Sequence, residues 1–135
     1  MEKHKHNYQH QEIPDKIYHV LQQLSGLLGT AGEAVSEVCL LFQQGETSRG
    51  MRALTEVIDA LQHIHNALEY LCSSGYAESL GLGEAKSELG EIFPAMLGSI
   101  EEQDFLALAD VMEYELKPAL ASCRNRLPEK PSLSN

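Results

Sequence analysis

The chain has 135 residues, which suits one domain with a single core. Its formal net charge of −10 argues against nucleic-acid binding, because phosphate contacts need clustered lysine and arginine. No run of about eighteen apolar residues is present, and the first residues lack the apolar core of a secretory signal. We therefore expect a cytoplasmic protein that makes no membrane contact.

The composition of both ends of the chain is typical of flexible tails. Residues 1–12 are polar and rich in histidine, and residues 128–135 are rich in proline and serine. We expect both segments to be flexible, flanking a single helical domain at residues 13–127. The histidines of the first segment could capture zinc or nickel weakly, but a plain polar tail is the favoured interpretation.

The first predicted helix is long. Apolar residues recur at helical spacing from residue 17 to residue 41, in one register across Gly26, Gly29 and Gly32. Because the register is unbroken, we expect one helix over about residues 14–44, with Gly45 as its C-terminal cap. Each interior glycine costs roughly 1 kcal/mol, so a break at these glycines stays open as the alternative.

The clearest helical pattern of the chain belongs to a second helix, expected over about residues 48–73. Its apolar residues are spaced three or four apart and form one stripe: Leu54, Val57, Leu61, Ile64, Leu68 and Leu71. Thr47 or Ser48 is the expected N-cap, and Gly75 should end the helix.

Two shorter helices are predicted to follow, at about residues 84–101 and 104–126. Asp104 is a suitable N-cap for the last one. Pro94 and Pro118 lie inside these helices, and each removes one amide donor and clashes with the carbonyl four residues earlier, so we expect kinks. Four helices with short connections predict an all-α, up-down four-helix bundle with a long first helix and proline-kinked third and fourth helices.

No residue pattern in the chain carries a specific metal chemistry. Carboxylate-bridged di-iron bundles need a glutamate three residues before a histidine, and that spacing is absent. Asp59 and His63 could share a metal ion, but an exposed pair is the more ordinary reading. His65 lies in line with Ile58 and Cys72 at the edge of the apolar stripe, where a partly buried, hydrogen-bonded histidine is expected. We therefore predict no bound metal ion or cofactor.

Acidic pairs provide the strongest case for an enzyme. Helical pyrophosphohydrolases hold magnesium with acidic residues at three-residue spacing on facing helices, and three pairs here have that spacing: Glu56 and Asp59, Glu88 and Glu91, and Asp110 and Glu113. Magnesium sites need the carboxylates to converge, whereas these pairs are predicted to lie on solvated faces. A metal-dependent hydrolase or a metal-binding bundle stays open as the alternative function.

The three cysteines, Cys39, Cys72 and Cys123, lie on or beside apolar stripes. An odd number in such positions indicates buried reduced thiols rather than a disulfide framework.

Six residues suggest contact with another protein. Four of them form a smooth strip that we expect on the outer side of the first helix, and two fall outside the inward stripe of the last helix: Ser25, Gly26, Gly29, Ser36, Leu106 and Val111. Small outward residues let a neighbouring helix approach closely. The alternative, that these are ordinary surface residues, stays open.

Residues 104–120, DFLALADVMEYELKPAL, resemble the ending of an uncharacterised family of small bacterial helical proteins. Together with residues 41–46, LFQQGE, the layout is similar to that of flagellar secretion chaperones, which are up-down helical bundles that hold an unassembled flagellin subunit. No functional residue matches a specific motif, so none is carried over. The resemblance implies a non-catalytic, chaperone- or adaptor-like binding module in a bacterial cytoplasm, whose partner is another protein or a second copy.

Overall fold

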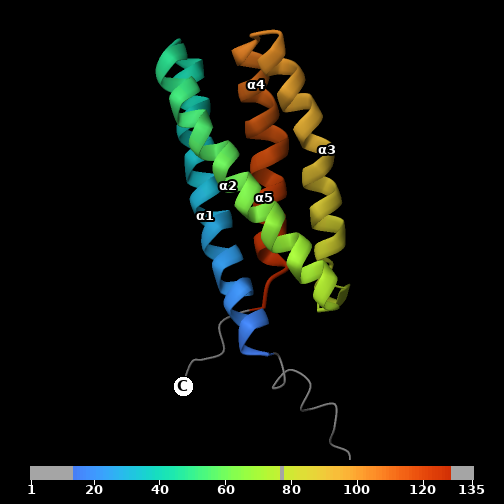
Figure 1. Cartoon of the computed structure of the whole chain (residues 1–135). Coiled ribbons are helices and arrows are strands. Elements are labelled where there is room, and N and C mark those ends of the chain that lie inside the picture. The colour runs from blue at the N-terminus through green and yellow to red at the C-terminus, as the bar shows by residue number, and fades with distance from the viewer. Residues whose placement is uncertain (1–13, 77, 129–135) are drawn as a thin grey trace, which may run out of the picture.

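The computed structural model describes residues 14–76 and 78–128, and within these residues the chain forms helices and no strand. The elements are α1 (Asp15–Gln43), α2 (Thr47–Ser74), η3 (Glu78–Leu80), α3 (Leu82–Glu101), α4 (Phe105–Val111), η4 (Met112–Leu116) and α5 (Lys117–Asn125). Because α4, η4 and α5 follow one another without a break, they form a single rod (Figure 1). The predicted all-α, up-down four-helix bundle is confirmed.

The predicted tails are not part of this description. Residues 1–13 and 129–135 lie outside the described residues, so the flexibility expected at 1–12 and 128–135 stays a prediction.

Helix α1 runs unbroken across its three glycines, as its register predicted. It ends in a Schellman motif: Gly45 has a φ of 79°, its N–H bonds the carbonyl of Phe42 at 3.1 Å, and the N–H of Glu46 bonds the carbonyl of Leu41 at 2.8 Å. Among the described helices, α1 is the one whose length and apolar composition would suffice to cross a membrane. Core helices of water-soluble bundles pass the same test, and α1 packs against both α2 and α5.

Helix α2 buries all six residues of the predicted stripe. Its N-terminus differs from the prediction: the N-cap position is Glu46, no side chain caps it, and Thr47 is already the first helical residue. Gly75, with a φ of 89°, ends the helix as expected.

The core of α1 is wider than the stripe that helical spacing predicts, which includes Val20, Leu27 and Ala34. The half-buried residues Val20, Leu27 and Ala34 pack against the core, while the deepest positions are occupied by residues one place further along the chain: Leu21, Leu28 and Val35. Because α1 is held between α2 and α5, it buries two adjoining sides, and its apolar face broadens accordingly.

The helix geometry differs at the two interior prolines, Pro94 and Pro118. Helix α3 continues through Pro94 to Glu101, and a kink there stays a prediction. In the last rod, the segment η4 is a turn of π-helix that ends directly before Lys117 and Pro118. A π turn widens the backbone where proline lacks an N–H and crowds the preceding turn, so the chain adapts to Pro118 without ending the rod.

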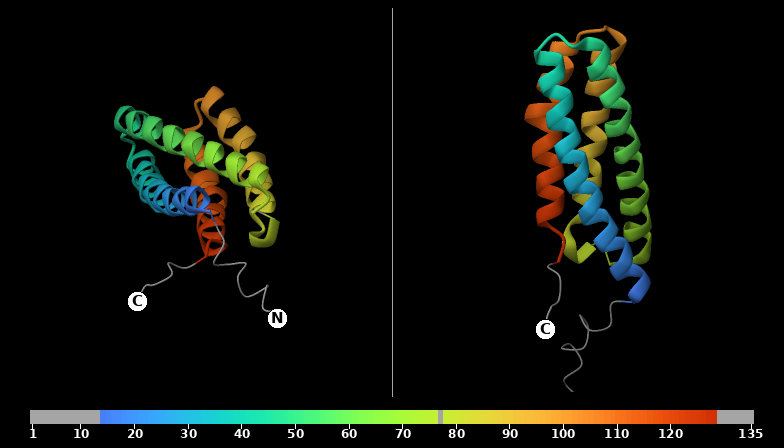
Figure 2. Two further views of the ribbon diagram at one scale, coloured as in Figure 1. Left: turned by 60° about the horizontal axis from the view of Figure 1, so that its bottom comes forward. Right: turned by 90° about the vertical axis from the view of Figure 1, so that its left-hand side faces the viewer.

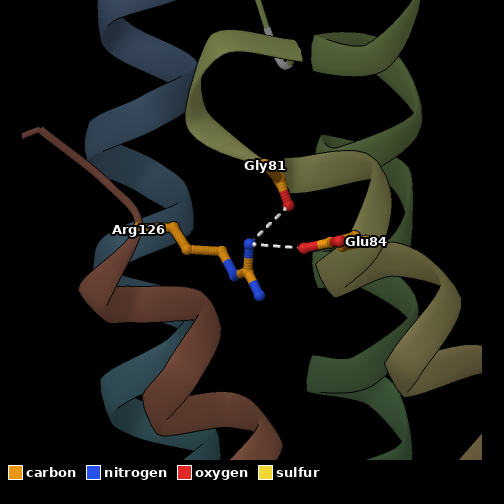
Figure 3. Close-up of polar contacts among 3 residues, drawn as sticks. All are labelled: Gly81, Glu84 and Arg126. Carbon is orange, nitrogen blue, oxygen red and sulfur yellow. Dashed lines mark hydrogen bonds and ion pairs between the residues drawn. The ribbon is translucent and has the colours of Figure 1, made fainter.

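Side-chain contacts join neighbouring helices at both ends of the bundle. At one end the rings of Phe42 and Phe105 stack with their centroids 5.2 Å apart. At the other end Arg126, which follows α5, donates from Nη1 to the carbonyl of Gly81 at 3.0 Å and lies 3.2 Å from a carboxylate oxygen of Glu84 (Figure 3). The last helix is thereby joined to the start of α3.

Candidate functional site

An apolar groove runs along the bundle between α2 and α3. The two helices lie close together near the loop that joins them and diverge toward their other ends (Figures 1 and 2). Two adjoining hollows of about 340 and 380 Å³ lie between them, and both are lined by Leu61, His65 and Phe93. From Ile58 to Cys72 the groove follows α2 for about 20 Å, given the 1.5 Å rise per residue of a helix.

The walls of the groove are large apolar side chains that lie just beyond the core. Ile58 on α2 is 45% exposed, and Leu97 on α3 is 57% exposed. They flank a floor that contains the buried Leu61 and Met96. Helix α2 packs far more extensively on α1 than on α3, so these side chains remain uncovered. A contiguous exposed apolar surface of this kind is typical of an interaction site, whereas single exposed leucines are ordinary.

The polar groups in the narrow half of the groove pair with one another. Lys86 of α3 lies 2.8 Å from a carboxylate oxygen of Glu69 on α2, and His65 lies 3.6 Å from the same oxygen. The hydrogen bond from Lys86 lowers the pKa of the Glu69 carboxyl and raises the pKa of Lys86. His65 lines the groove at the edge of the apolar stripe, but its side chain is 48% exposed, so the prediction of a partly buried histidine is wrong.

The candidate metal ligands do not gather. Asp59 and His63 lie 3.7 Å apart on an exposed face of α2, but no group of three or more histidine, cysteine or acidic side chains converges among residues 14–76 and 78–128. The acidic pairs lie on different sides of the bundle: Glu88 and Glu91 line a hollow beside Arg126, and Asp110 and Glu113 lie near Cys39. The geometry needed for a magnesium cluster is therefore not present in the described part of the chain.

The three cysteines are free. Burial raises the pKa of the Cys39 thiol to about 11, with a further contribution from the Glu113 carboxylate, and burial raises the pKa of Cys123 to about 11 as well. Cys72 is only partly buried and lines the narrow half of the groove. The prediction of reduced, unpaired thiols agrees with this arrangement, and Cys72 is the most accessible of them.

The six residues predicted to form an interface are divided among several surfaces. Ser25 lines a hollow beside α5, and the guanidinium of Arg124 covers Gly29, so this part of the strip already receives a side chain of the same molecule. Gly26 faces a hollow between α1 and α2 instead. Leu106 is 63% exposed on α4, whereas Ser36 and Val111 are half-buried. Ser25 and Gly26 therefore face different hollows, and the role of the six residues in binding stays a prediction.

One family comparison covers most of the domain. The family described as "Domain of unknown function (DUF8042)" matches residues 19–126. The chain belongs to this family. No curated protein and no solved structure matches the chain significantly. The DUF8042 match agrees with the resemblance to an uncharacterised helical family, and it spans both walls of the groove.

Sequence reasoning missed the groove, although part of its signal was visible. The sequence predicts that Ile58, His65 and Cys72 lie at the edge of the α2 stripe, and these residues form one wall of the groove. On α3, helical spacing predicts Phe93 and Ile100 in the core, yet both are only half-buried, and Leu97 lies outside the predicted stripe. An apolar residue beyond the expected stripe on each of two neighbouring helices was the signal available.

Proposed function

We propose that the protein is a non-catalytic, chaperone- or adaptor-like module that binds a helical segment of another protein in the groove between α2 and α3. The observation that carries this proposal is the exposed apolar pair of Ile58 and Leu97 on opposite walls above a buried floor. A helix that lays its apolar face into such a groove contacts both walls with residues spaced three and four apart. The length of the groove, about 20 Å, corresponds to about four helical turns.

The shape and lining of the groove favour a peptide over a small substrate. Small-molecule sites are concave and place a few convergent polar groups around the ligand. Here the wide half of the groove is open and its lining is mostly apolar, with Gln62 and His65 as the polar exceptions. The hydrolase alternative would need converging carboxylates, and the described residues do not bring them together.

The proposal also includes the location of the protein, which we place in a bacterial cytoplasm. The similarity in layout to flagellar secretion chaperones supports a bacterial cytoplasmic protein that holds a helical segment of its client. The net charge of −10 would help to keep such a complex soluble.

The test compares two exposed leucines. Leu97→Asp places a charge on the groove wall, and Leu106→Asp places the same charge at a similarly exposed position on α4, outside the groove. The wild-type protein and both variants would be used to capture partners from a cell extract, and the captured protein would then be purified and titrated against each form. We expect Leu97→Asp to weaken binding by about 100-fold, or about 2.7 kcal/mol. Leu106 belongs to the competing interface predicted from the sequence, so Leu106→Asp should leave binding unchanged if the groove is the site.

Circular dichroism establishes that both variants remain helical. Equal binding by the wild type and Leu97→Asp would overturn the groove as the binding site. Loss of binding in Leu106→Asp alone would favour the α4 surface.

A further inference from the structure

Acidic residues are concentrated in the stretch of chain that runs from α3 to η4. Residues 87–116 contain eight acidic residues and no lysine or arginine. They extend from α3 through the following turn and along α4 and η4: Glu88, Glu91, Glu101, Glu102, Asp104, Asp110, Glu113 and Glu115. Three of the eight, Glu101, Glu102 and Asp104, lie at the end of α3 and in the turn after it, and all three are exposed, so we call these three residues the acidic margin.

This acidic margin reaches the wide half of the groove. Glu101 lies four residues after Leu97 on α3, so the two side chains share one side of the helix, and Glu101 is exposed. The facing wall of α2 is neutral at Ile58 and Gln62. No lysine or arginine lines this half, whose lining includes His65, whereas in the narrow half Lys86 already neutralises Glu69. On the α3 side, a ligand in the wide half therefore lies beside the negative charge of Glu101.

We infer that the occupant of the groove is an amphipathic helix whose apolar face is flanked, on its α3 side, by lysine or arginine. This inference rests on the proposed function and adds the chemistry of the partner. The apolar face would cover Ile58, Phe93 and Leu97, and the basic flank would lie along Glu101 and the α3–α4 turn. A second copy of the chain fits less well, because it carries the same net charge of −10 and self-repulsion opposes its docking.

The experiment uses two designed helical peptides of about four turns with identical apolar faces. One peptide carries lysines along the flank and the other carries glutamates. Binding of each to the full chain is measured by fluorescence anisotropy at about 0.05 M and about 0.5 M salt. We expect the lysine peptide to bind about tenfold more tightly at low salt, and we expect salt to reduce the difference because exposed charges are screened.

Two charge-reversal variants test whether the preference for the lysine peptide depends on the acidic margin. Glu101→Lys should reduce the preference for the lysine peptide by about threefold or more, because it reverses the charge nearest to Leu97. Glu33→Lys changes the net charge equally at an exposed position on α1 and should leave the preference unchanged. Equal effects of the two reversals would show that only the net charge matters and would overturn the assignment to this margin.

The outcomes separate this inference from the proposed function. If both peptides bind equally and Leu97→Asp weakens both, the groove binds helices but the basic flank is wrong. Tighter binding of the glutamate peptide would also overturn the inference. Binding of neither peptide would overturn both proposals. A dimer in light scattering that Leu97→Asp dissociates would identify a second copy as the occupant and would contradict the basic partner.

Discussion

Gly50 leaves room for the Phe42 ring at one end of the bundle. It is buried in the first turns of α2, and a Cβ built there would lie 2.5 Å from the Phe42 ring, which stacks on Phe105. We expect Gly50→Ala to lower the free energy of unfolding by about 1–3 kcal/mol, because overpacking outweighs the better helix propensity of alanine. Urea denaturation measures the change.

The control is a glycine in open space. Nothing lies within 4 Å of a Cβ built on Gly26, which is in the interior of α1. Gly26→Ala should therefore raise the free energy of unfolding by about 0.5–1 kcal/mol. If the two substitutions stabilise the protein equally, the Phe42 contact does not restrict Gly50.

The cysteines should differ in reactivity because their environments differ. Iodoacetamide at pH 8 should modify Cys72 in the native protein well before Cys39 and Cys123, which are buried and have pKa values raised to about 11. Mass spectrometry of the digested protein measures this order, and in concentrated urea all three should react. Native Cys39 reacting as fast as Cys72 would contradict the burial of its thiol.

The raised pKa values also predict how stability depends on pH. The native state holds both buried thiols protonated above their ordinary pKa of 9.0, whereas the unfolded chain releases these protons. The associated stability is therefore present below pH 9.0 and declines as the pH rises toward about 11. Cys123→Ala should make this decline shallower than in the wild type.

At the scale of the element, the backbone is strained directly after α3, because a residue other than glycine adopts a positive φ there. Gln103 has a φ of 56°, and the N–H groups of Gln103 and Asp104 bond the carbonyls of Ile100 and Ser99 at 3.0 and 2.9 Å. This is the same Schellman geometry that Gly45 supplies after α1, but here a residue with a Cβ occupies the left-handed position. Asp104 then begins the next rod, and its carboxylate accepts from the N–H of Ala107 at 3.1 Å, which confirms the predicted cap.

Gln103→Gly should raise the free energy of unfolding by about 1 kcal/mol, because glycine adopts a positive φ without the steric cost of a Cβ. Gly45→Ala, at the equivalent position after α1, should lower it by about the same amount. Thermal and urea denaturation measure both. A destabilising Gln103→Gly would mean that the glutamine side chain contributes more than its backbone strain costs.

At the scale of the whole molecule, Arg126 joins the last rod to the start of α3. Its side chain is 28% exposed, while that of Glu84 is 80% exposed, so the bond to the Gly81 carbonyl is the better shielded of its two contacts (Figure 3). The Nε atom is buried and has no hydrogen-bond partner among the described residues. The stabilisation therefore comes mainly from the backbone contact and from the packing of the aliphatic stem.

Two substitutions separate these contacts. Arg126→Met retains the stem and should lower the free energy of unfolding by about 2 kcal/mol, because the Gly81 carbonyl loses a charged donor. Glu84→Gln should cost about 0.5 kcal/mol or less, as is usual for an exposed ion pair. Amide hydrogen exchange should also accelerate near residues 78–85 in Arg126→Met alone. Equal effects of both variants would assign the stabilisation to the ion pair.

The sequence by itself determined the helices and most of the core. Apolar spacing is a local property, and it located α1 across its glycines, the six buried residues of α2 and the Asp104 cap. The angle between α2 and α3 follows instead from contacts between residues far apart in the chain, including those of α2 with α1. For this reason the tertiary structure alone decided that Phe93 and Leu97 line an open groove and that Arg124 covers Gly29. The helical period specifies which residues share a face, but only packing decides whether another helix covers that face.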